Sequence, residues 1–121
     1  MLTAEVGWIP RDRLSPMVSN QDIQALADRI VAEFRPSKVV LFGSHASGTP
    51  GADSDIDLLV VIGFNGPAFR KAAEIRAALT NEFAIDIVAR TPEDVERRYR
   101  LGDPIVRHAI DHGVVLYSAA A

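Results

Sequence analysis

The chain has 121 residues, with 13 basic side chains, 16 acidic side chains and no cysteine, so its formal net charge is −3. This length suits one domain, and the absence of cysteine excludes disulfide scaffolds, thiolate zinc sites and thiol catalysis. The acidic excess argues against direct nucleic-acid binding, and no apolar run approaches the roughly 20 residues that span a bilayer. The N-terminal residues lack the pattern of a secretory signal, so we expect a cytoplasmic protein without membrane association.

Helices are predicted where apolar residues recur at helical spacing between a capping residue and a Pro or Gly, and strands where short β-branched runs end at turn residues. In chain order these are a helix from Ser19 or Asn20 to Pro36, a strand from Val39 to Phe42, a short helix from Ser44 to Ser47, a strand from Ile56 to Ile62, a helix from Pro67 with an apolar stripe to Phe83, a strand from Ala84 to Ala89, a helix capped by Thr91, a helix from about Pro104 to His112 closed by Gly113, and a strand from Val114 to Tyr117.

This alternation predicts one α/β domain, with helices packed on a small sheet. We expect the domain to span residues 19–121. Residues 1–18 show no clean period and are predicted to form an N-terminal arm, with Trp8 as its docking residue.

Two carboxylates, Asp55 and Asp57, stand at the start of the second predicted strand. Strand side chains alternate between faces, so both point the same way, about 7 Å apart. Such a pair suits Mg²⁺, although solvated acids at an exposed strand entry give the same pattern. Asp86, amid apolar neighbours, either faces solvent or joins a charged site, because burying an unpaired carboxylate costs several kcal/mol. If its strand lies beside the first, three carboxylates converge in a two-metal geometry for phosphoryl transfer.

Gly43 and Ser44 follow the first predicted strand. Glycine lets the backbone approach a ligand closely, and free N–H groups at the start of the following short helix suit a phosphate. A plain Gly-Ser turn is the alternative interpretation.

These residues resemble a known family. Gly43-Ser44, ten further residues and then Asp55-Ile56-Asp57 fit the GS-x10-DxD signature of the nucleotidyltransferase superfamily with the DNA polymerase β fold. The chain looks most like the minimal nucleotidyltransferases, which are often encoded beside a HEPN-domain ribonuclease toxin as its antitoxin. The resemblance covers roughly residues 20–117. It implies a small mixed sheet of about four strands flanked by helices.

The resemblance also implies roles for the matching residues. Gly43 and Ser44 would hold the β- and γ-phosphates of ATP, and Asp55 and Asp57 would bind Mg²⁺, with two ions expected. Asp86 would complete the metal site and help to deprotonate the attacking hydroxyl. The implied reaction transfers AMP from ATP to a tyrosine of a HEPN toxin, which silences its ribonuclease, and it implies a hetero-oligomer with that toxin.

One position departs from the family pattern. Many relatives read Gly-Ser-x-Ala-Arg-Gly, whereas this chain has Ser47 in place of the arginine. His45 either substitutes for the missing cation or is a solvated loop residue. Three functions therefore stay open: a protein adenylyltransferase, a transferase with a small-molecule acceptor, and an antitoxin that inhibits its toxin by binding alone.

Other polar residues have simpler interpretations. His108 and His112 have the i, i+4 spacing of zinc ligands on a helix, but no third ligand is evident and surface histidines are favoured. The basic segment 96–100 is typical of a solvated helix face that could also contact a toxin, RNA or phosphate. Asp53 is interpreted as a turn residue rather than a third metal ligand.

Overall fold

A computed structural model of the chain describes residues 18–48, 55–79 and 83–119. The elements are α3 (Asn20–Phe34), β1 (Lys38–Phe42), α4 (Ser44–Ser47), β2 (Ile56–Val61), α5 (Ala68–Ala78), β3 (Ile85–Arg90), α6 (Pro92–Leu101), α7 (Pro104–His112) and β4 (Val114–Ser118). Their order confirms the predicted alternation of helices and strands. The predicted N-terminal arm, apart from Val18, and Asp53 lie outside the described residues.

Capping residues set the start of α3, as the sequence predicts. The Ser19 hydroxyl accepts a hydrogen bond from the Asp22 N–H at 3.0 Å, and the Asp22 carboxylate accepts one from the Ser19 N–H at 3.0 Å. This reciprocal pair satisfies two N–H groups that the first turn leaves unpaired. The helix ends with Arg35 in the left-handed conformation, directly before Pro36.

The predicted helical stripe running to Phe83 is wrong at its C-terminal end. Helix α5 ends at Ala78, and the backbone of Leu79 leaves the helical region so that the chain can turn toward β3. Leu79 is nevertheless buried and Phe83 packs against the core, so both contribute apolar surface from outside the helix. Pro67 caps α5 rather than opening its first turn.

The four strands form one mixed sheet in the order β3-β2-β1-β4. Strand β1 is antiparallel to β2 and to β4, whereas β2 and β3 are parallel. A parallel pair needs a crossover connection, and α5 provides it. The mixed four-stranded sheet flanked by helices confirms the predicted fold class.

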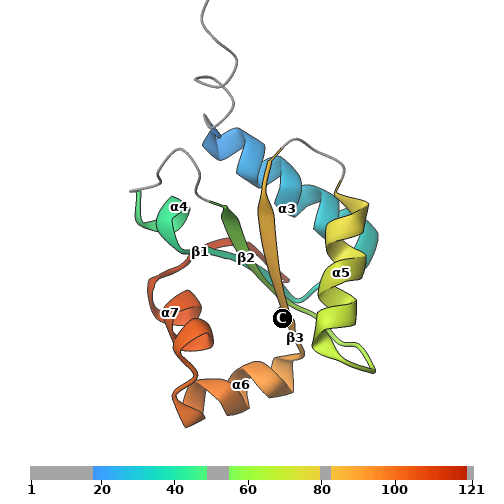
Figure 1. Cartoon of the computed structure of the whole chain (residues 1–121), viewed down its shortest axis with the longest axis vertical. Helices are drawn as coiled ribbons and strands as arrows, with labels where there is room; N and C mark the ends of the chain where they lie inside the picture. The colour runs from blue at the N-terminus through green and yellow to red at the C-terminus, as the bar shows by residue number, and fades with distance from the viewer. Residues whose placement is uncertain (1–17, 49–54, 80–82, 120–121) are drawn as a thin grey trace, which may run out of the picture.

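Helices cover the two faces of the sheet with different partners (Figure 1). The larger core lies between the sheet and α3 and α5, where Ile30, Leu58 and Ile75 are fully buried. A smaller cluster lies on the opposite face, where Ala109 of α7 and Val95 of α6 pack with apolar strand residues. We call this second side the α7 face of the sheet.

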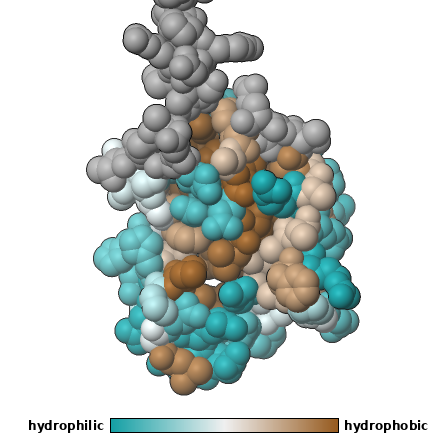
Figure 2. All heavy atoms as spheres, viewed as in Figure 1, coloured by the Kyte–Doolittle hydropathy of each residue, from teal (hydrophilic) through white to brown (hydrophobic). Residues whose placement is uncertain are grey.

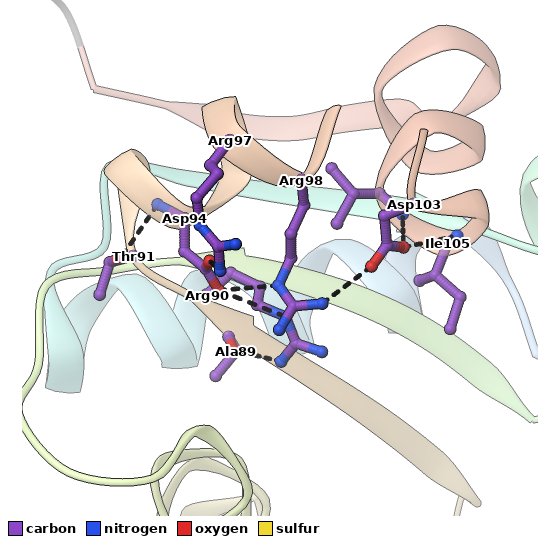
Figure 3. Close-up of polar contacts among 9 residues, drawn as sticks. Ala89, Arg90, Thr91, Asp94, Arg97, Arg98, Asp103 and Ile105 are labelled. Atoms are coloured by element: carbon purple, nitrogen blue, oxygen red, sulfur yellow. Dashed lines mark hydrogen bonds and ion pairs between the residues drawn. The ribbon is translucent and has the colours of Figure 1, made fainter. Parts of the chain in front are cut away.

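Helix α6 is held mainly by polar contacts, since none of its residues is fully buried. The Asp94 carboxylate accepts hydrogen bonds from Arg98 Nε at 2.9 Å and from Arg97 at 2.6 Å, and Arg90 Nε lies 3.9 Å away (Figure 3). Arg98 also donates to Asp103, in the turn before α7, at 2.9 Å. Asp94 thus connects the end of β3 to α6, and Arg98 connects α6 to the start of α7.

Gly113 ends α7 as predicted, and close packing rather than backbone conformation requires glycine there. Its φ of −78° is an ordinary value, so no left-handed cap closes the helix. A Cβ at this position would instead overlap the Ala109 carbonyl oxygen and lie 2.6 Å from Val40 Cγ1. Glycine is needed here because it lets α7 pass directly onto β1.

Candidate active site

The predicted carboxylates lie together at one end of the sheet. In the strand register, Asp57 of β2 lies opposite Phe42 of β1 on one side and Asp86 of β3 on the other. Register partners on adjacent strands share a face and are about 4.8 Å apart across the ladder. Asp86 is exposed and Asp57 is partly buried. The two acid-bearing strands are therefore neighbours, which is the condition under which the carboxylates were expected to converge.

Both carboxylates belong to the α7 face. Asp57 precedes Leu59 by two residues and Asp86 precedes Val88 by two, and both apolar residues belong to the cluster on that face. Since side chains two positions apart on a strand share a face, the acids extend this apolar cluster at its end. Asp55 lies one residue before β2 and is exposed. In the view of Figures 1 and 2, hydrophobic side chains fill the middle of the molecule and a largely hydrophilic surface covers α6.

Gly43 packs directly against the carboxylate of Asp57. Its φ of +78° and ψ of −157° fall in a region that is essentially restricted to glycine. A Cβ at this position would overlap Asp57 Oδ2 and lie 3.2 Å from Asp57 Cγ. The backbone at the end of β1 therefore fixes the place of this carboxylate, and any side chain at residue 43 would displace it.

The environment of Asp57 opposes its ionisation. Burial raises the pKa of its carboxyl group, and the neighbouring carboxylates of Asp86 and Asp55 raise it further, whereas His45 lowers it. A carboxylate that is both partly desolvated and repelled by two others is stabilised by a nearby cation. The site thus favours a positively charged ligand.

The donor set has the chemistry of a magnesium site. Carboxylate oxygens are the ligands that Mg²⁺ prefers, and the carboxylate held by Gly43 supplies a fixed one. Among the residues that the structure describes, no three acidic, histidine or cysteine side chains are placed to hold one metal ion together. The structure thus aligns Asp57 with Asp86, whereas the predicted convergence of three carboxylates, Asp55 included, is not seen among the described residues.

Helix α4 has the predicted bounds, Ser44–Ser47, and begins directly after Gly43, which packs against Asp57. The N–H groups of Ala46 and Ser47 both bond the Gly43 carbonyl at 3.1 Å, which closes the single turn. The Ser47 hydroxyl donates to the Ser44 carbonyl at 3.1 Å, within the helix. The residue that replaces the family arginine thus makes a local contact and adds no positive charge to the site.

The position of His45 does not fit the interpretation as a solvated loop residue. His45 stands in α4 and is partly buried, rather than lying in a solvated loop, and its charge acts on Asp57. Its position directly after Gly43-Ser44, which end a strand near an acidic pair, is the signal that could have placed it here.

The remaining polar residues that the sequence singled out belong to α6 and α7. His108 and His112 are exposed on α7, as the surface interpretation predicts. The basic segment 96–100 is a solvated helix face only in part, because Arg98 is bound to Asp94 and Asp103. Within the described ranges, no helix has the length and apolar character that crossing a membrane requires.

The family described as "Nucleotidyltransferase domain" matches residues 23–116, from α3 to β4. The chain belongs to this family. The matched span holds most of the 121 residues, including Gly43, Ser44 and the three carboxylates of this nucleotidyltransferase. The comparison with curated proteins gives no match.

Two solved structures share the fold of this nucleotidyltransferase. A candidate nucleotidyltransferase from Sulfolobus solfataricus is 17% identical, with a TM-score of 0.59 over 93% of this chain and 91% of that chain. A toxin–antitoxin crystal structure with AMP-PNP is 19% identical, with a TM-score of 0.54 over 79% of this chain and 73% of that chain. At these identities the likeness concerns the fold alone.

Proposed function

We propose that this nucleotidyltransferase transfers AMP from ATP to a tyrosine hydroxyl of a HEPN-class ribonuclease toxin, and so acts as the antitoxin of that toxin. The observation that carries the proposal is the alignment of Asp57 and Asp86 on adjacent strands, next to a glycine that packs against the Asp57 carboxylate. Such an arrangement has little use in a plain core, since the acids repel one another.

The proposed roles follow from position and chemistry. Asp57 and Asp86, aligned on adjacent strands, would hold Mg²⁺, and Asp55 at the strand entry would add a further oxygen ligand, with two ions expected. Gly43 and Ser44 would hold the β- and γ-phosphates of ATP, where the chain leaves β1 and enters α4. The ions, when bound, supply positive charge that neutralises the triphosphate and the departing pyrophosphate.

The chemical step moves one proton and one adenylyl group. The tyrosine oxygen forms a bond to the α-phosphorus, and the bond from that phosphorus to the bridging oxygen of the β-phosphate breaks, so pyrophosphate leaves. Asp86, which is exposed, is the base proposed to accept the phenolic proton. Asp57, whose carboxylate packs against Gly43, would hold Mg²⁺ rather than take the proton.

Two considerations support a protein acceptor. The chain resembles minimal nucleotidyltransferases, and one of its fold neighbours is a toxin–antitoxin structure with AMP-PNP. Asp55 and Asp86 are also exposed at the sheet end, where a hydroxyl carried by another protein can reach them. A partner protein would therefore supply the acceptor.

A second candidate, an antitoxin that acts by binding alone, is favoured by one observation. Ser47, which stands in place of the family arginine, carries no charge, and its hydroxyl donates to the Ser44 carbonyl within α4. Weak triphosphate binding would follow if no other cation compensated.

The test mixes the chain with its cognate toxin, labelled ATP and Mg²⁺, and follows label on the toxin and its ribonuclease activity. The proposal expects label on a toxin tyrosine and loss of ribonuclease activity, both abolished in Asp57→Asn. A tight, inhibitory complex without label would favour the binding antitoxin. Label on an added antibiotic or sugar, but not on the toxin, would identify a small-molecule transferase.

A further inference from the structure

Helix α7 presents three distinct sides, and only one of them lacks a packing role. Val106 and Ala109 are buried against the sheet. Arg107 and Asp111 face α6, where the Tyr99 hydroxyl donates to Asp111 at 2.7 Å and the Arg107 guanidinium lies over the Tyr99 ring at 4.9 Å. The other side carries two exposed histidines, one turn apart, which the proposed transfer reaction does not use.

The separation of these two rings is close to that of a chelating pair. The ring centres of His108 and His112 are 5.5 Å apart. A zinc-bound imidazole nitrogen lies about 2.0–2.1 Å from the ion, and its ring centre about 1.1 Å farther, so two imidazoles on one tetrahedral ion have ring centres roughly 5 Å apart. The two rings, tilted by 44° to each other, are therefore at a separation at which rotation of the side chains can turn one nitrogen of each toward a single ion.

We propose that His108 and His112 form a binding site for a divalent transition-metal ion such as Zn²⁺, separate from the carboxylate site at the end of the sheet. Two imidazole nitrogens provide the protein ligands, and water completes the tetrahedral sphere. Imidazole favours zinc, copper and nickel over Mg²⁺, so the two sites take different classes of metal.

Two further features support a cation here. His112 is the last residue of α7, and the carbonyl end of a helix carries partial negative charge that favours a cation. Both rings are exposed, so they can bind an ion without first leaving a packed interior. The ion would link residues i and i+4 across the final turn and so brace the point at which α7 passes through Gly113 into β4.

The composition of the chain makes the proposal simple to test. The sequence has 3 histidines and no cysteine, so His45 is the one other strong ligand for zinc. The experiment is calorimetric titration of the tag-free chain with ZnCl₂, in excess Mg²⁺ to occupy the carboxylates. The variants are His108→Gln, His112→Gln and their double mutant, with His45→Gln as the matched control. Because both proposed ligands are exposed, circular dichroism should show that all variants are folded.

We expect one zinc ion per chain, and an affinity at least tenfold weaker in either single variant. The double mutant should be no weaker than the single variants, since the first substitution already destroys the chelate. His45→Gln should bind as the unmodified chain does. Equal zinc affinity in the unmodified chain and the double mutant, or a loss confined to His45→Gln, would overturn the proposal without bearing on nucleotidyl transfer.

Discussion

Replacing Gly43 by alanine is the sharpest perturbation of the proposed site. The backbone there has φ +78° and ψ −157°, a region that costs about 1–3 kcal/mol for a residue with a Cβ. The added methyl would also overlap Asp57 Oδ2 and lie 3.5 Å from Asp57 Cβ, so the carboxylate must move. Forcing an extra methyl into packed surroundings costs about 1–3 kcal/mol more. We therefore expect Gly43→Ala to lower the free energy of unfolding by about 2–6 kcal/mol.

A matched control separates backbone strain from displacement of the carboxylate. Gly102, at the end of α6, also has a positive φ, +86°, but a Cβ there meets nothing within 4 Å. Gly102→Ala should lower the free energy of unfolding only through its left-handed backbone, by about 1–2 kcal/mol. Urea denaturation followed by circular dichroism gives the free energy of unfolding of both variants. Label transfer from ATP, measured without urea at a temperature where each variant is folded, gives both activities.

The two variants should differ in kind as well as in magnitude. Gly43→Ala should lose transfer by much more than its unfolded fraction explains, because Asp57 no longer holds its place. Gly102→Ala should keep its transfer rate per folded molecule. If Gly43→Ala retained full transfer while folded, the contact between Gly43 and Asp57 would have no part in the site.

Three further predictions concern stability. Asp57 has a raised pKa, so the stability that it contributes below its unfolded pKa is lost as pH rises through its folded pKa. After allowance for solvent screening, Asp57→Asn at pH 7 should be as stable as the unmodified chain, or up to about 1 kcal/mol more stable, in thermal denaturation. A variant less stable than the unmodified chain would contradict the repulsion. Hydrogen bonds from Arg98 and then Arg97 lower the pKa of Asp94, so its stabilisation is present above an unfolded pKa of about 3.9 and disappears as pH falls through the folded pKa. Asp94→Asn should thus cost about 1–2 kcal/mol in urea denaturation at pH 7 and progressively less as pH falls below about 3.9, and a cost that does not change with pH would refute the ion-pair account. Gly113→Ala should cost about 1–3 kcal/mol because its methyl would meet Val40, while Gly63→Ala, where a Cβ meets nothing within 4 Å, should change the melting temperature little.

Local signals predicted most of the fold. Ser19 and Thr91 cap their helices as the sequence indicates, because a capping hydroxyl acts on N–H groups only two or three residues away. The C-terminal end of α5 was mispredicted because Leu79 is apolar at helical spacing, and periodicity alone cannot show where the backbone must turn.

The site depended on contacts that the sequence leaves open. Asp55 and Asp57 share a face through strand alternation, which is a local property. The position of Asp86 beside Asp57 depends on the pairing of β2 with β3 and on its register, both of which the whole sheet decides. The approach of Gly43 to Asp57 likewise arises between strands, and the ion pair of Asp94 with Arg90 joins α6 to the end of β3. The sequence could therefore identify Gly43, Asp57 and Asp86 as candidate site residues but could not predict the contacts between them.

The most direct test of the central claim compares ATP labelled at the α-phosphate with ATP labelled at the γ-phosphate. Each is incubated with Mg²⁺, the cognate toxin and either the unmodified chain or Asp57→Asn. Nucleotidyl transfer predicts that only the α-label becomes covalently attached to the toxin, and only with the unmodified chain. Attachment of the γ-label, or equal attachment of the α-label by Asp57→Asn, would contradict the account.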